Sequence, residues 1–304
     1  MTAQILPGTL ARAVDDTTAR ALASGALQPI ETDERFVEEG GVRFLVRSVS
    51  SLARKALERL HDAGAAAASP RAANPFLPPE PELTVGAVSD THVAILNKFN
   101  VLDRHLLIVT RRFEHQERLL GPEDFDALWR CMAEYDALGF YNGGEVAGAS
   151  QPHKHLQMVP LPLLPDLAEV PVTPLLDRVP DAEGMHRVPG LPFLHTFARL
   201  APGLHRNPSR AATLTGALYR AMLARAGLRT VQAADGPRQS GPYNLLVTRR
   251  WMLLVPRSVE YWEGISVNSL GFAGSLFVRE AAQMDLIRRL GPFAVLRGVA
   301  HPVA

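Results

Sequence analysis

Apolar and polar residues recur along the chain with two periods, which predict a mixture of helices and strands. Apolar positions three and four residues apart are typical of amphipathic helices, and this spacing predicts helices over residues 9–24, 50–64, 122–138, 208–225 and 277–290. Short apolar or alternating runs are typical of strands, and they predict strands over residues 83–88, 92–97, 105–110, 140–142, 153–159, 193–200, 243–248 and 251–255. The connections resemble hairpins, so we expect an α+β fold rather than a doubly wound parallel sheet.

Two long segments between these elements are rich in proline. Residues 64–82 are rich in Ala and Pro, and we expect them to be irregular except for an ordered stretch at 74–77. Residues 160–192 hold eight prolines and predict a segment that crosses the surface. The acidic run over residues 31–39 is most simply a solvated surface.

A faint internal repeat bears on the domain organisation. LLIVTRR at residues 106–112 is echoed by LLVTRR at 245–250, and either two related halves or coincidence in an Arg-rich chain explains it. We expect an N-terminal domain over 1–165, a crossing segment over 166–192 and a C-terminal domain over 193–304.

Composition narrows the class of protein. Apolar residues make up 47% of the 304 residues, mean hydropathy is +0.01 and net charge is +1, which is typical of a globular protein without a strong field toward nucleic acid or membrane. No apolar run is long enough to span a bilayer and no signal peptide is evident, so we expect a soluble, cytoplasmic protein. The single cysteine, Cys131, excludes a disulfide within the chain and a zinc site of several cysteines.

Lysine is rare in this chain. Of the 32 basic residues three are Lys, which leaves 29 Arg, a bias typical of a GC-rich genome and of a bacterial source. Lys55, Lys98 and Lys154 therefore survive either by chance or because a compact ammonium group is needed where a guanidinium does not fit.

The segment GASQPHKHLQMVP, residues 148–160, carries the strongest chemical signal. In a strand, residues two apart share a face, so His153, His155 and Gln157 point one way and Lys154 points the other. Two imidazoles and an amide on one face are costly in a core unless they have partners or a function. The preceding loop has glycines at 143, 144 and 148 and can bring backbone N–H groups close to an anion.

Three interpretations of this histidine row remain open. A neutral imidazole can attack phosphorus and pass the group on, and the central His155 is then the nucleophile, oriented by His153 and assisted by Gln157. The H-x-H spacing also suits a transition metal, with a third ligand from His92, His105, His115 or His195. The histidines can also be structural, each satisfied by a partner in the fold.

The sequence SQPHKHLQ, preceded by FYNGG, resembles the histidine-triad superfamily in the branch with Gln at the third position. Four further segments are similar to its fungal-type ATP adenylyltransferases, also called diadenosine tetraphosphate phosphorylases. They are SVSSLARKA at 48–56, LNKFNVLDRHLLIVTRRFEHQ at 96–116, PYNLLVTRRWMLLVPRS at 242–258 and ISVNSLGFAGSLFV at 265–278.

The resemblance implies antiparallel sheets with flanking helices. It implies reversible phosphorolysis of diadenosine tetraphosphate to ATP and ADP through an adenylylated histidine, which by motif position is His155. We expect no resident cofactor, and whether Mg²⁺ accompanies the nucleotide stays open. The net charge of +1 and the lack of a long apolar run predict no nucleic-acid or membrane partner. The substrate-binding positions that the resemblance implies are Lys55, Asn97, Lys98, Asn142, Gly148, Ala149, Ser150, Gln151, Thr248, Arg250, Trp251, Asn268 and Gly271.

Other functions compete with this interpretation. Gln-Pro before His153 is closer to the Asn-Pro of the hexose-1-phosphate uridylyltransferases, which would use a sugar phosphate. A dinucleoside polyphosphate hydrolase would usually carry His at position 157, so Gln157 favours transfer to phosphate over transfer to water. A nucleotide-binding regulator or metal-dependent binding protein without turnover is the alternative outside the enzymes.

Overall fold

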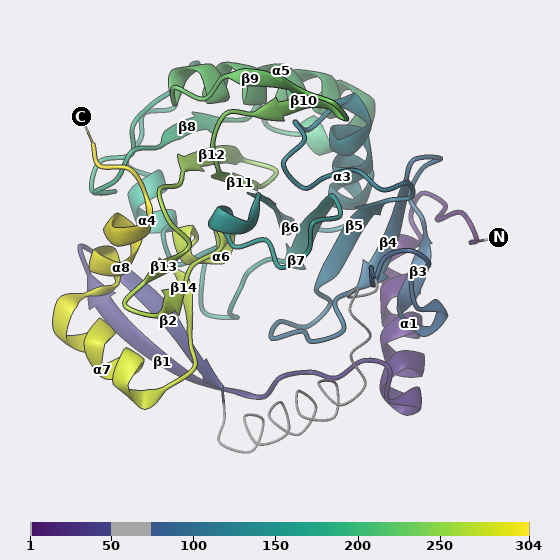
Figure 1. The fold of residues 1–304 in the computed structure, drawn as a ribbon, viewed down its shortest axis with the longest axis horizontal. Helices are drawn as coiled ribbons and strands as arrows, with labels where there is room; N and C mark the ends of the chain where they lie inside the picture. Colours follow the sequence, from purple (N-terminus) through teal and green to yellow (C-terminus); the bar gives the residue numbers. More distant parts are fainter. Residues whose placement is uncertain (1, 50–73, 304) are drawn as a thin grey trace.

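The computed structural model describes residues 2–49 and 74–303, and it is an α+β fold (Figure 1). The helix expected over 50–64 lies outside the described residues. The helices are α1 Leu10–Ser24, α3 Pro122–Glu134, α4 Thr173–Leu176, α5 Pro208–Arg225, α6 Ser269–Phe272, α7 Ala281–Leu290 and α8 Pro292–Val299, with 3₁₀ turns η1 Pro81–Leu83, η2 Glu145–Ala147 and η3 Leu204–Arg206. No described helix combines the length and the apolar character needed to cross a bilayer.

Eight strands form the central sheet, in the order β3-β4-β5-β7-β6-β11-β12-β8 with every neighbour antiparallel. They are β3 Thr84–Ala87, β4 His92–Leu96, β5 Leu106–Thr110, β6 Ala137–Gly143, β7 His155–Pro160, β8 Thr196–Arg199, β11 Tyr243–Val247 and β12 Trp251–Pro256. The pairing of β6 with β11 makes one sheet from strands of both parts of the chain.

The remaining strands form three small sheets. β1 Thr32–Glu39 and β2 Val42–Val49 form a hairpin, and β15 Ser275–Val278 adds to β2 in parallel. β9 Thr230–Ala233 pairs with β10 Gly236–Gln239, and β13 Tyr261–Trp262 pairs with β14 Ile265–Ser266.

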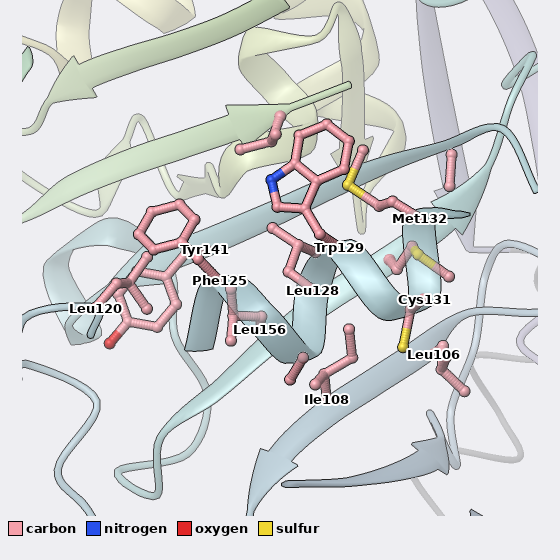
Figure 2. Close-up of a cluster of buried hydrophobic side chains, with 14 of the residues drawn as sticks. Leu106, Ile108, Leu120, Phe125, Leu128, Trp129, Cys131, Met132, Tyr141 and Leu156 are labelled. Carbon is pink, nitrogen blue, oxygen red and sulfur yellow. The ribbon is translucent and has the colours of Figure 1, made fainter. Parts of the chain in front are cut away.

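One face of the central sheet is covered by α1, α3 and α5, which bury a continuous apolar cluster. Figure 2 shows the part of this cluster around α3. Pro122 at the first turn of α3 is pre-organised for a helix, and the side chains of Phe125, Leu128, Trp129 and Met132 are buried against the sheet. The helix ends at Glu134, four residues before the predicted end, because residues from Ala137 onward pair with β7 as β6.

The opposite face is covered at two ends and carries the histidine row between them. At one end, Phe76 packs on Val93, Ile95, Leu107 and Val109. At the other, β2, the 163–191 segment and α6 to α8 bury a large cluster with β6, β11 and β12. The polar residues of β7 therefore lie between two apolar clusters.

The structure corrects several sequence predictions. Strand β15 takes up the start of the helix expected over 277–290, which leaves α7 at Ala281–Leu290. The acidic run is solvated as predicted, although it forms the edge strand β1, which was not predicted. The segment over 160–192 does not simply cross the surface, because Val170, Val172, Leu175 and other apolar residues between its prolines are buried in the second cluster. The hairpin β9–β10 and helix α8 were not predicted from the sequence.

The alternation predicted for β7 is confirmed. Leu156 and Met158 are buried against the helices, and Lys154 points the same way into a buried ion pair. Its Nζ lies 2.6 Å from Oδ2 of Asp124 and donates to the carbonyl of Leu119 at 3.0 Å. Burial raises the pKa of the Asp124 carboxyl, but the charge of Lys154 and the hydrogen bond with His92 outweigh burial and leave this pKa below its usual value.

We predict that Lys154→Ala lowers the free energy of unfolding by about 3–5 kcal/mol, because it leaves the Asp124 carboxylate buried without its cation. Chemical denaturation measures the loss. The matched control is Arg12→Ala, which removes the exposed ion pair with Asp16 and should change stability by less than about 1 kcal/mol. Equal losses in the two variants would contradict a special role for the buried pair.

Candidate active site

A cavity of about 320 Å³ opens on the sheet face that carries the histidine row. Its walls come from β2, β6, β7, the 97–105 turn and the 261–283 segment. Seven of the residues expected in the site line it: Asn97, Asn142, Gly148, Ser150, Gln157, Asn268 and Gly271. The fold therefore brings together segments that lie far apart in the sequence.

A second cavity of about 680 Å³ adjoins the first along the loop before β7. Ala149 and Gln151, also expected in the site, line this second cavity. The two cavities share five lining residues: Gly148, Ser150, Tyr261, Ser266 and Arg279. The loop residues Gly148 and Ser150 and the side chain of Arg279 therefore lie where the two cavities meet.

The His155 imidazole is neutral and has one hydrogen-bonded ring nitrogen. Nδ1 lies 2.8 Å from the carbonyl oxygen of His153, and because a carbonyl can only accept, Nδ1 carries the proton and Nε2 carries the lone pair. Burial lowers the pKa of His155 to about 4, so the ring is neutral at physiological pH. His155 shares its strand face with Gln157, a lining residue of the first cavity, and Phe76 packs over it at 5.3 Å between ring centroids.

His153 has both ring nitrogens engaged. Nε2 donates to the carbonyl of Thr110 at 2.8 Å, and Nδ1 lies 3.0 Å from the amide nitrogen of Asn74, which can donate to it. Burial lowers the pKa of His153, which keeps this arrangement neutral. These two hydrogen bonds fix the orientation of the His153 ring, and the lone pair on Nδ1 already accepts a hydrogen bond from Asn74.

Gln157 is oriented by a histidine that sequence analysis considered only as a metal ligand. Nε2 of His105 lies 2.9 Å from Oε1 of Gln157, and Nδ1 lies 3.1 Å from the amide nitrogen of Asn97. With Nδ1 accepting and Nε2 donating, the carbonyl of Gln157 is occupied and its NH₂ group is the end left to donate. Burial lowers the pKa of His105 to about 4.

The loop before β7 is tightly packed against the segment that begins α6. Gly148 has φ +87°, a conformation that favours glycine, and a Cβ there would lie 2.9 Å from both the Val267 carbonyl and the Asn268 Cβ. Asn268 in turn accepts from the N–H of Leu270 and caps α6. The loop and α6 are thus held together at close range.

His153 and His155 line neither cavity themselves, although Gln157 on the same strand face lines the first. Four other expected site residues lie away from both cavities, and a fifth lies outside the described residues. Lys98 binds Glu80 at 2.7 Å and lines neither cavity. Thr248, Arg250 and Trp251 lie at the β11–β12 turn, where Trp251 donates to Glu169 and packs at Phe197, so this placement corrects their assignment to substrate binding. Lys55 lies outside the described residues.

The described part of the chain offers no additional side chains that could bind a metal ion together with the histidine row. Within residues 2–49 and 74–303, no three His, Cys, Asp or Glu side chains are grouped to hold an ion. His92 is bound to Asp124 on the other side of the sheet, and His195 binds the backbone of Val188 and Phe193.

Sequence reasoning missed His105 as an orienting residue, and it missed Arg47, Tyr261 and Arg279 altogether. His105 could have been found, because a hairpin places it beside Asn97, whose N–H donates to the His105 carbonyl at 2.9 Å. Arg47 and Arg279 reach the cavity from β2 and from the segment after β15, which carry no motif.

Comparisons with known proteins cover nearly the whole chain. The family model described as the Ap4A (diadenosine tetraphosphate) phosphorylase N-terminal domain matches residues 1–178, and the ATP adenylyltransferase C-terminal domain matches 189–302. Protein APA1 of Saccharomyces cerevisiae is 28% identical in an alignment of 296 positions, which covers 90% of this chain and 88% of APA1. Diadenosine 5′,5‴-P1,P4-tetraphosphate phosphorylase 2 of the same yeast is 27% identical over 71% of each chain.

The fold is also that of a solved relative. The crystal structure of yeast Ap4A phosphorylase Apa2 superposes with a TM-score of 0.77 at 22% identity, covering 99% of this chain and 96% of Apa2. These relatives come from yeast, so they lend no support to the expected bacterial source. Residues 1–178 match one family model, and residues 189–302 match its companion. The chain therefore belongs to the Ap4A phosphorylase and ATP adenylyltransferase family.

Proposed function

We propose that this protein is a nucleotidyltransferase that cleaves Ap4A with phosphate to ATP and ADP, reversibly, through an adenylylated His155. One observation carries the proposal: the bond from Nδ1 of His155 to a carbonyl leaves a neutral ring with its lone pair on Nε2. Membership of the family and the activity for which the second yeast relative is named support the same substrate.

The shape of the site suits a dinucleotide. Two adjoining cavities can each take one nucleoside, and the polyphosphate chain between them would run past Gly148, Ser150 and Arg279. Arg279 has no ion-pair partner among the described residues, so its charge is available to phosphate. Any Mg²⁺ would enter with the polyphosphate, and we expect the reaction in the cytoplasm.

The proposed reaction has two displacements at one phosphorus. Nε2 of His155 bonds to the α-phosphorus while the bond to the bridging oxygen breaks, and the bridging oxygen leaves on ATP. An oxygen of inorganic phosphate then bonds to the same phosphorus, the P–N bond breaks, and ADP leaves. The NH₂ group of Gln157 can donate to the phosphoryl oxygens in both steps without changing charge.

Phosphate should be preferred to water as the acceptor. Water must lose a proton to attack well, and a general base needs a free lone pair. His153 and His105 each have both ring nitrogens engaged, and Gln157 does not titrate. Phosphate is already anionic at neutral pH and needs no such base.

We predict that consumption of Ap4A depends on phosphate. With phosphate, chromatography should reveal ATP and ADP in equal amounts. Without it, turnover should stop after about one equivalent of ATP per enzyme. Continuous release of AMP and ATP at the same rate without phosphate would mean that the enzyme is a hydrolase.

We predict that the AMP adduct forms on His155. Intact-protein mass spectrometry after mixing with Ap4A without phosphate should detect it, and peptide mapping should locate it. His155→Ala should lower kcat by several orders of magnitude, because it removes the attacking atom, whereas His153→Ala should cost less. Both histidines are buried, so the melting temperature of each variant is measured alongside. An adduct on His153 would overturn the assignment.

We predict that adduct formation resists mild acid. A histidine with the ordinary pKa of about 6.5 would lose roughly tenfold in neutral form between pH 7.5 and pH 5.5. His155, with its pKa lowered to about 4, stays neutral over that range, so the single-turnover rate should change by less than about twofold. A tenfold fall centred near pH 6.5 would contradict the buried, neutral ring.

A further inference from the structure

A fully buried polar network lies directly behind Asn142. The side-chain oxygen of Asn142 accepts three hydrogen bonds: from Nδ2 of Asn244 at 2.9 Å, from the N–H of Ser269 at 3.0 Å and from Oγ of Ser269 at 2.7 Å. Asn142 and Asn244 face each other across the β6–β11 pair, and Ser269 is the first residue of α6.

These bonds fix which end of the Asn142 amide faces the cavity. A backbone N–H can only donate, so the atom bonded to Ser269 N must be the oxygen of Asn142. The NH₂ group is therefore the end that remains for the cavity, which Asn142 lines. Two N–H donors directed at a polyphosphate are favourable, whereas a carbonyl oxygen there would repel it.

Asn244 is itself held in one orientation. Nη1 of the buried Arg257 donates to Oδ1 of Asn244 at 2.7 Å, which leaves Nδ2 of Asn244 to donate. Nδ2 then reaches Asn142, the hydroxyl of Ser269 and the carbonyl of Ala147 at 2.9 Å. Ala147 directly precedes Gly148, so the same amide also ties down the loop.

We propose that Asn244 is a positioning residue: it turns the Asn142 amide so that its N–H donors face the phosphates of the bound nucleotide. The inference rests on the proposed function, because it takes the occupant of the cavity to be a nucleotide. Neither Asn244 nor its anchor Arg257 lines the cavity, so any effect of Asn244 on the ligand must pass through Asn142 or the loop.

The variant Asn244→Asp isolates this role. A carboxylate of the same size keeps an acceptor for Arg257 and gains an ion pair with it, which favours folding. It can no longer donate to Asn142, and a charged acceptor 2.9 Å from the Asn142 oxygen is repulsive. The Asn142 amide is expected to rotate, because a charge-assisted bond from its NH₂ group to the carboxylate outweighs the neutral bond from Ser269 N, while the Ser269 hydroxyl can turn and accept from that NH₂ group instead.

The test is a double-mutant cycle read by AMP affinity. Calorimetry gives the Kd of AMP for the wild type, Asn142→Ala, Asn244→Asp and the double variant, and thermal melts are run alongside. We expect each single variant to raise Kd about tenfold and the double variant to raise it no further, since both act through one amide. Ser269→Ala, which removes one donor, should raise Kd about threefold and is the substitute if Asn244→Asp does not fold.

A control variant separates positioning from general loss of stability. Thr215→Val removes the buried hydroxyl that binds Trp129 on the opposite face of the sheet, so it should lower the melting temperature without changing the Kd of AMP. Provided that the wild type binds AMP, two results would overturn the inference. One is an unchanged Kd in Asn244→Asp, and the other is a Kd raised about a hundredfold in the double variant, which would mean that the two single effects multiply. A wild type that neither binds AMP nor turns over Ap4A would overturn the proposed function and this inference with it.

Discussion

The antiparallel pairing of β6 with β11 is the contact on which the rest of the structure depends. It joins strands that belong to the two matched domains into one eight-stranded sheet, and residue for residue it sets Asn142 opposite Asn244. On one side of the pair β7 carries His155 and Gln157, and on the other β12 leads to the buried Arg257. A shift of one residue would turn every side chain of β11 to the opposite face and separate the two amides.

The polar groups of the site are tolerable in the interior because each has a partner. Four polar residues of the site are buried, and each is hydrogen-bonded to an amide, a hydroxyl or a carbonyl: His105, His153, Gln157 and Asn142. Arg257 is buried with its guanidinium on the Asn244 side chain and on backbone carbonyls, and burial lowers its pKa to about 10. The same bonds that satisfy these groups also orient them, so stability and pre-organisation have one physical origin.

Sequence reasoning succeeded where local pattern decides the outcome. Strand period placed His153, His155 and Gln157 on one face and Lys154 on the other, and glycines marked the loop. It failed where the outcome depends on distant pairing: nothing near Arg47 or Arg279 in the sequence says that β2 and β15 meet beside the site. The expectation for Trp251 failed for a related reason. An aromatic residue at the end of a strand can either stack on a nucleobase or pack in the core, and only the tertiary structure reveals that Trp251 packs in the core.

The parallel pairing of β2 with β15 has a consequence for biosynthesis. Arg47 donates to the hydroxyl of Ser275, a partner 228 residues away, and both residues line the first cavity. At roughly 5–20 residues per second, a ribosome needs roughly 10–50 s to deliver that partner. During this interval the β2 edge has no β15 to pair with, and the nascent chain has no complete nucleotide site. Catalytic competence therefore requires that Ser275 has been synthesised, and until then the β2 edge presents backbone N–H and C=O groups that β15 will later pair.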